Sequence, residues 1–165
     1  MNDPIKHIVV LILENHSFDQ MLGCLKVVYP GLDGIDPQNF RSNADQSGKS
    51  FSQAPTTERQ MLLDPHHEVP HVETQLASGN SGFVTDFAAA FADSSEQARP
   101  YIMGYYPLDF LPALHQLARN FTICDRWHSS LPGPTWPNRF FALGGTSLGR
   151  VNMPDDGDHK LDLAG

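Results

Sequence analysis

The stretch that decides the fold is "VVLILENHSFDQMLG", residues 9–23. A mainly apolar run over residues 6–13 shows little alternation of polar and apolar side chains, which is typical of a strand buried on both faces of a parallel sheet. The run stops at Glu14 and Asn15, and residues 17–22 can then form a short helix that Gly23 closes. The sequence therefore predicts a strand that ends at two polar side chains.

The rest of the chain alternates helical and strand patterns. A second strand is expected over residues 121–127, and a polar segment over residues 30–58 reads as a long surface excursion. In such α/β proteins ligands bind just beyond the carboxyl ends of the strands, so Glu14 and Thr135 are expected at the same edge of the sheet. Helices are expected over residues 72–78 and 84–92. A third expected helix ends at Asn120 and has an apolar face made of Leu111, Leu114, Leu117 and Ala118. A fourth has Pro137 near its first turn and ends at Gly144 and Gly145.

Composition limits the classes of function. The chain has 165 residues, 40% of them hydrophobic, and a formal net charge of -8, which argues against nucleic acid as the main partner. No apolar run approaches the roughly 18 residues of a membrane span, and no export signal is visible at the N-terminus. Cys24 and Cys124 are expected to be two core thiols, with a disulfide as the alternative.

Glu14 and Asn15 offer a carboxylate and an amide oxygen, which are hard ligands suited to divalent cations. Read from spacing alone, a simpler interpretation competes with this one. Asn15 would cap the helix that starts near Ser17, and Glu14 would favour the positive end of that helix. Spacing by itself favours the capping interpretation.

The segment "LPGPTWPNR", residues 131–139, places Thr135 at the start of a helix. Free N–H groups and the helix dipole favour an anion there, and a hydroxyl in that position can attack a phosphoryl or acyl group if its pKa is lowered. The alternatives are that Thr135 is an ordinary N-cap and that Arg139 faces either a phosphate or the surface.

Three histidines, His66, His67 and His71, cluster with Asp64 and Glu68. Imidazoles in this number indicate metal binding or proton transfer, and a solvated polar loop is an equal alternative. Nearer the C-terminus, an acidic stretch lacks the spacing of a calcium loop and is expected to be a solvated turn. Its residues are Asp155, Asp156, Asp158 and His159.

Three blocks in order resemble the bacterial phosphoesterase family that includes phospholipases C and an acid phosphatase. "IVVLILENHSFDQMLG" is similar to its "ENRSFD" signature, and "LLDPHHE" with "GNSGFV" is similar to its "DPxHE…GxMDGF" segment. The third block runs from "MGYY" through "GPTWPNR" to "GTS". The resemblance implies an α/β three-layer sandwich with a parallel sheet, of the alkaline-phosphatase-like type.

The resemblance also implies residue roles. Glu14 and Asn15 match metal ligands, and Thr135 matches the nucleophile, which also contacts the metal. His67 matches the histidine of "DPxHE", which lies near the substrate phosphate, and Asn138 and Arg139 are expected to hold the loop. The implied cofactor is a divalent metal ion, with Zn, Ca and Mg all open.

The sequence departs from the family pattern in three respects, and one of them is that "FVTDF" replaces "MDGF" in part. His16 stands where the familiar signature has Arg. Family members run to about twice this length or more, and their second half supplies an Asp pair that completes the metal site. We therefore expect residues 1–165 to be the N-terminal part of a phosphoesterase catalytic domain, with the sandwich incomplete.

The expected function is a metal-dependent phosphoric-ester hydrolase, phospholipase C-like or acid phosphatase-like, that acts on a phospholipid or a small phosphate ester. The alternative is an inactive fragment that at most folds or binds. A sulfatase-like activity is disfavoured because sulfatases of this superfamily need a modified Cys or Ser at the position of Thr135. Family members are often exported, and the sequence leaves the location and the oligomeric state open.

Overall fold

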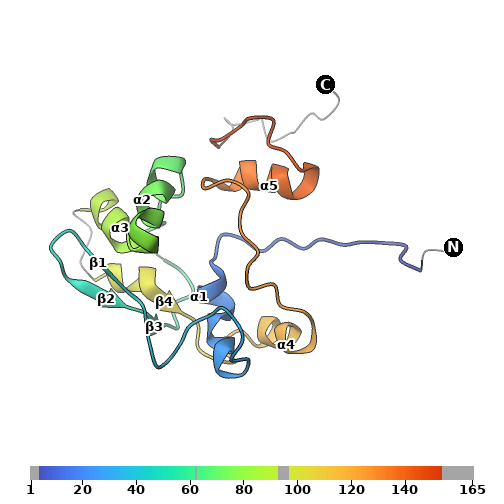
Figure 1. The fold of residues 1–165 in the computed structure, drawn as a ribbon, viewed down its shortest axis with the longest axis horizontal. Coiled ribbons are helices and arrows are strands. Elements are labelled where there is room, and N and C mark those ends of the chain that lie inside the picture. Colours follow the sequence, from blue (N-terminus) through green and yellow to red (C-terminus); the bar gives the residue numbers. More distant parts are fainter. Residues whose placement is uncertain (1–3, 62, 93–96, 154–165) are drawn as a thin grey trace.

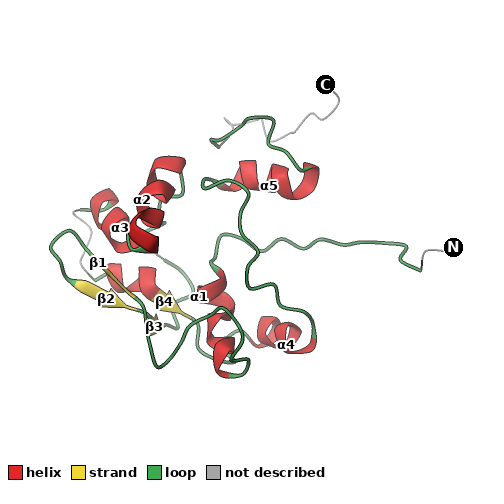
Figure 2. Ribbon diagram, viewed as in Figure 1, coloured by secondary structure: helices red, strands yellow, loops and turns green. Residues whose placement is uncertain are grey.

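The computed structural model describes residues 4–61, 63–92 and 97–153, which form helices and small sheets joined by long loops (Figures 1 and 2). The sheets are an antiparallel pair, β1–β2, and a parallel pair, β3–β4. No helix in these residues is long and apolar enough to cross a bilayer. The elements are α1 (Phe18–Leu22), η1 (Gly23–Val27), β1 (Ser42–Ala44), β2 (Ser50–Ser52), β3 (Ala54–Pro55), α2 (Val69–Asn80), α3 (Phe83–Ala90), η2 (Arg99–Met103), β4 (Gly104–Tyr105), α4 (Pro112–Asn120) and α5 (Thr135–Gly144).

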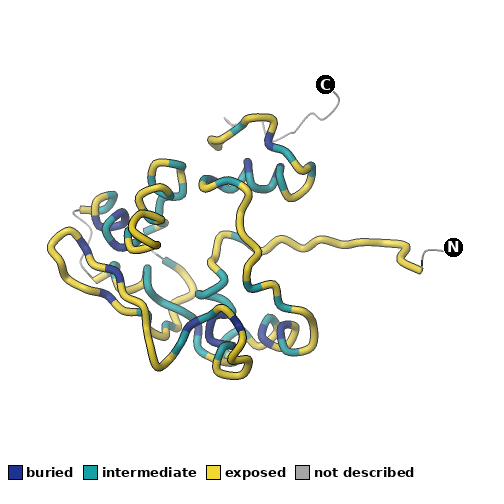
Figure 3. The backbone as a smooth tube through the Cα atoms, viewed as in Figure 1, coloured by how far each residue is buried: buried dark blue, intermediate teal, exposed yellow. Residues whose placement is uncertain are grey.

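The predictions of a strand at residues 6–13 and of another at residues 121–127 are wrong. Residues 6–13 run as an exposed segment away from the rest of the chain (Figures 1 and 3), with Val9 89% exposed. The second stretch is a loop in which Trp127 is 83% exposed. A strand forms only where its N–H and C=O groups meet a partner strand, and neither stretch pairs with one in the described residues. A parallel sheet between two helical layers is therefore not seen there.

The helices follow their local signals. Ser17 is the N-cap of α1, because its hydroxyl accepts a hydrogen bond from the N–H of Gln20 at 3.1 Å. The expected turn between the second and third helices is present, with Gly82 directly before α3. Helix α4 ends at Asn120 as predicted. Its predicted apolar face is only partly correct, because Leu117 is 56% exposed.

A buried histidine takes part in the small core near α1 and α4. His115 is fully buried, its Nδ1 accepts from the N–H of Asp109 at 2.9 Å, and its Nε2 lies 2.9 Å from the carbonyl of Met21. A neutral ring with the proton on Nε2 satisfies both contacts. The core cluster beside it contains Cys24, Leu25, Leu32 and Ala118.

The two thiols do not form a disulfide. Cys24 is buried and Cys124 is exposed, and both are free. The expectation of two core thiols therefore holds for Cys24 alone. Burial raises the pKa of the Cys24 thiol, so this thiol keeps its proton at neutral pH.

Residues 30–58 contain the β1–β2 hairpin, which packs on α3. The side-chain oxygen of Asn43 accepts from the N–H of Phe83 at 3.0 Å, at the start of that helix. Asp45 organises the hairpin turn, because Oδ1 accepts from the Ser47 hydroxyl at 2.6 Å and Oδ2 lies 2.7 Å from Nη1 of Arg99. The Ser47 hydrogen bond is the main cause that lowers the pKa of Asp45 below its usual value.

Replacing Asp45 with Asn should lower the free energy of unfolding at pH 7, and this deficit should shrink below about pH 4. The folded-state pKa of Asp45 is depressed, so its stabilising effect is present above the unfolded-state pKa and is lost as the pH falls through the folded-state pKa. Urea unfolding of both proteins at pH 7 and pH 3 measures the difference. Asp36→Asn, which removes the charge of a carboxylate that accepts from the N–H of Gln38 in a local turn, is the control. An equal deficit at both pH values would contradict the prediction.

Candidate functional site

Two residues far apart in sequence meet where the exposed N-terminal segment joins α1. Thr135 donates a hydrogen bond from Oγ1 to Oδ1 of Asn15 at 3.0 Å, across 120 positions of the chain. Neither residue is a helix cap, since Ser17 caps α1 and Pro134 is the N-cap of α5. The capping interpretation of Asn15 and of Thr135 is therefore wrong, and the two oxygens lie together.

Glu14 is paired with the same helix. Arg139 donates from Nε to Oε1 of Glu14 at 2.7 Å, and its Nη2 contacts the same oxygen. The hydrogen bond to Glu14 raises the pKa of Arg139. The guanidinium also lies 4.4 Å from the ring centroid of Trp136. Arg139 thus faces a carboxylate and an indole, which is neither of the two alternatives from the sequence and not the expected loop-holding role.

Asn138 holds the loop that precedes α5. Its Oδ1 accepts from the N–H of Leu131 at 3.0 Å. Its amide nitrogen donates to the carbonyls of Leu131 at 3.0 Å, Gly133 at 3.2 Å and Pro134 at 3.0 Å. A single side chain therefore fixes the backbone that carries Thr135, as the sequence led us to expect. Gly133 is needed in this loop, because a Cβ there would lie 2.9 Å from Cγ2 of Val69.

These residues line one open cleft of about 1210 Å³. All four residues that the sequence predicts to be catalytic or metal-binding line this cleft. They are Glu14, Asn15, His67 and Thr135. The backbone N–H of His67 donates to Oε2 of Glu68 at 3.2 Å, so the segment that carries His67 is tied to the next side chain. The cleft also contains the N-terminal end of α5, where free N–H groups favour an anion.

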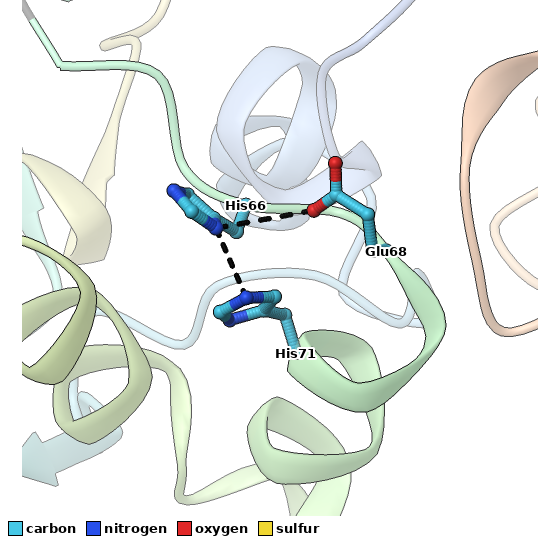
Figure 4. Close-up of side chains that lie close together, drawn as sticks. All are labelled: His66, Glu68 and His71. Carbon is cyan, nitrogen blue, oxygen red and sulfur yellow. Dashed lines mark hydrogen bonds and ion pairs between the residues drawn. The ribbon is translucent and has the colours of Figure 1, made fainter. Parts of the chain in front are cut away.

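A second polar group lies nearby, at the start of α2. Ligand atoms of His66, Glu68 and His71 all lie within 4.8 Å of one another, and Figure 4 shows the three side chains converging. Nδ1 of His66 is 3.0 Å from Nε2 of His71 and 3.9 Å from Oε2 of Glu68. This group could hold a metal ion. The pKa of Glu68 is lowered, mainly by a hydrogen bond from its own backbone N–H.

Two further residues support this group, and the sequence reasoning missed both. Nδ1 of His71 lies 2.8 Å from Oδ1 of the buried carboxylate of Asp86. Gln75 donates from Nε2 to Oδ2 of Asp86 at 2.8 Å and to the carbonyl of His66 at 2.8 Å. The four-residue spacing of His71 and Gln75 places them on one helical face, and this signal was available in the sequence. The acidic stretch from Asp155 to His159 lies outside the described residues.

Comparisons with known proteins agree on one family. The model of the Phosphoesterase family matches residues 5–164. Non-specific phospholipase C3 of Arabidopsis thaliana is 33% identical over 88% of this chain and 30% of that protein. Non-specific phospholipase C6 of the same plant is 35% identical over 90% of this chain and 29% of that protein. Phospholipase C A of Mycobacterium tuberculosis is 32% identical over 84% of this chain and 29% of that protein. The chain spans about 30% of the length of the curated relatives it matches.

Replacing Asn138 with Ala should destabilise the loop before α5 by about 1–3 kcal/mol, because the Leu131 N–H and three carbonyls lose their partner. The change should also alter the fluorescence of Trp136, which lies next to Thr135. Urea unfolding monitored by fluorescence and by circular dichroism measures both effects.

Asn120→Ala is the matched control. Asn120 makes one exposed hydrogen bond, to the carbonyl of Gln116 at 2.7 Å, so its loss should cost well under the Asn138 value. Equal unfolding midpoints for the two variants would show that Asn138 does not hold the loop.

Proposed function

Because this chain belongs to the phosphoesterase family, we propose that it acts in the hydrolysis of phosphoric esters, with Thr135 as nucleophile and a divalent metal as cofactor. The observation that supports this most is the 3.0 Å contact between the Thr135 hydroxyl and the Asn15 amide oxygen, at a cleft that Glu14 and His67 also line. An alcohol, an amide and a carboxylate lie on this cleft although 120 positions of the chain separate Thr135 from Asn15.

The oxygens present fit a hard cation. Two ligands of an octahedral ion at about 2.1 Å from the metal are about 3 Å apart, which is the separation of Oγ1 and Oδ1. Arg139 contacts Oε1 of Glu14 through both Nε and Nη2. We therefore assign the other oxygen, Oε2, to the ion. Bound there, a divalent ion would lower the pKa of the hydroxyl and neutralise phosphate oxygens.

The chain's own residues supply the remaining parts of the proposed reaction. Thr135 Oγ1 loses its proton to water and attacks phosphorus, the ester P–O bond breaks, and the leaving alkoxide takes up a proton. Water then hydrolyses the phosphothreonine. The N–H groups at the start of α5 favour the phosphate, and His67 donates a hydrogen bond to one of its oxygens. Arg139 positions Glu14 and does not itself touch the phosphate.

The substrate class follows from the relatives. The proteins matched are named phospholipases C, so a phosphodiester of a phospholipid head group is the first candidate and a phosphomonoester is the second. The alternative is an inactive fragment. It is favoured by the exposed apolar segment at residues 6–13, which has no strand partner in the described residues.

The domain assignment belongs to the same proposal. Mixed helices and small sheets are consistent with an α/β phosphoesterase domain. We assign residues 1–165 to the N-terminal part of that domain, with a three-layer sandwich as its complete form.

Thr135→Ala should lower turnover at least about a thousandfold, because the nucleophile is removed while the cleft keeps its shape. The assay uses p-nitrophenyl phosphorylcholine and p-nitrophenyl phosphate, each with a chelator and with added Zn²⁺, Ca²⁺ or Mg²⁺. Turnover by the unchanged chain should depend on one of these metals. Thr122→Ala, at an exposed position, is the control and should keep full activity.

Two outcomes decide against the proposal. Wild-type turnover in folded Thr135→Ala would exclude threonine as nucleophile. No turnover of either ester by a folded, metal-supplemented wild-type chain would favour the inactive fragment.

A further inference from the structure

From the geometry around α2, we propose a second, nitrogen-rich metal site that binds Zn²⁺ through His66, Glu68 and His71. It is separate from the oxygen site at Glu14, Asn15 and Thr135 and does not depend on phosphoester chemistry. Two imidazoles and one carboxylate are a ligand set that suits zinc rather than magnesium or calcium.

The distances are close to those that a zinc ion requires. Zinc–nitrogen bonds of about 2.0–2.1 Å in a tetrahedral site place two nitrogens about 3.3 Å apart. Nδ1 of His66 and Nε2 of His71 are 3.0 Å apart. Oε2 of Glu68 is 3.9 Å from Nδ1 of His66, and a small rotation of this half-exposed side chain brings it into range. Three protein ligands leave the fourth position to water.

The hydrogen bond behind His71 is the strongest argument. Both oxygens of Asp86 accept, Oδ1 at 2.8 Å from Nδ1 of His71 and Oδ2 at 2.8 Å from Nε2 of Gln75. The proton of the His71 ring therefore lies on Nδ1, and the lone pair of Nε2 points at Nδ1 of His66. A histidine whose other nitrogen donates to a buried carboxylate is the usual arrangement of a metal-bound imidazole.

The local fold orders this group before any ion arrives. His71 lies in the first turn of α2, and Asp86 lies in the first turn of α3, which packs against α2. Gln75 joins the two, because its amide also donates to the carbonyl of His66 at 2.8 Å. The ring of His66 rests edge-on against Phe91, with the ring centroids 5.3 Å apart. Of the three ligands, only the Glu68 side chain is left to be ordered on binding, which favours affinity.

The alternative is that the two histidines only share a hydrogen bond in the wall of the cleft. That arrangement needs a proton between Nδ1 of His66 and Nε2 of His71, and it gives Glu68 no role at the pair. The convergence of the carboxylate on the same point favours the ion. Metal titration separates the two.

The test is zinc binding by the full chain after treatment with a chelator, measured by competition with a chromophoric chelator and by elemental analysis. One equivalent should bind tightly to the wild type. His66→Ala and Glu68→Ala should each weaken it at least about tenfold, and Asp86→Asn should weaken it about 10–100-fold through the orientation of His71. Co²⁺ bound in place of Zn²⁺ should show the strong visible absorption of a tetrahedral site.

Two variants act as controls. His7→Ala removes an exposed histidine of the N-terminal segment and should bind zinc as the wild type does. Glu14→Gln should also bind one equivalent of zinc tightly, because Glu14 belongs to the oxygen site. Circular dichroism checks folding, and Glu68 is exposed, so its replacement should leave the fold intact. Wild-type affinity in folded His66→Ala and Glu68→Ala, or no zinc bound by the wild type, would overturn the proposal.

Discussion

The pairing of Glu14 and Asn15 with helix α5 is the constraint on which the site depends. Arg139 contacts Glu14 and Thr135 contacts Asn15, so two adjacent residues at the end of the apolar segment are each tied to the first turns of one helix. Neither contact is local. The position of the Thr135 hydroxyl is thus set twice, by Asn15 from one side and by the Asn138 loop from the other. A hydroxyl held in this way loses little freedom when a substrate binds.

Local chemistry explains which parts of the fold were predictable. Ser17 and Gly82 act within a few residues of their own positions, so the start of α1 and the turn before α3 could be read from the sequence. The sequence could not show that residues 6–13 and 121–127 remain unpaired in the structure. A strand depends on a partner strand, and the periodicity of side chains does not identify that partner. His115 was missed for a similar reason, since one of its two backbone partners, the carbonyl of Met21, lies 94 positions away.

The residues of the candidate site also divide into those that the sequence predicted and those that it did not. Glu14, Asn15, His67 and Thr135 were named from motifs, and all of them line one cleft. The roles of Asp86 and Gln75 were not foreseen, because they act on other side chains rather than on a ligand. His66, His67 and Glu68 are neighbours, yet His66 and Glu68 approach His71 while the site assigned to His67 is the phosphate. In our proposals, these three consecutive residues serve two different groups.

The exposed apolar segment has a consequence for handling the protein. Residues 8–13 present six large aliphatic side chains that are 43–89% exposed, along a backbone without a partner strand in the described residues. An exposed, unpaired stretch of this composition favours β-pairing between molecules and therefore aggregation. His7 and Glu14 directly flank this run as polar gatekeepers, and Lys6 precedes His7. Dilute samples at moderate ionic strength, or a charged residue in place of Val9, are therefore the practical route to a monodisperse preparation.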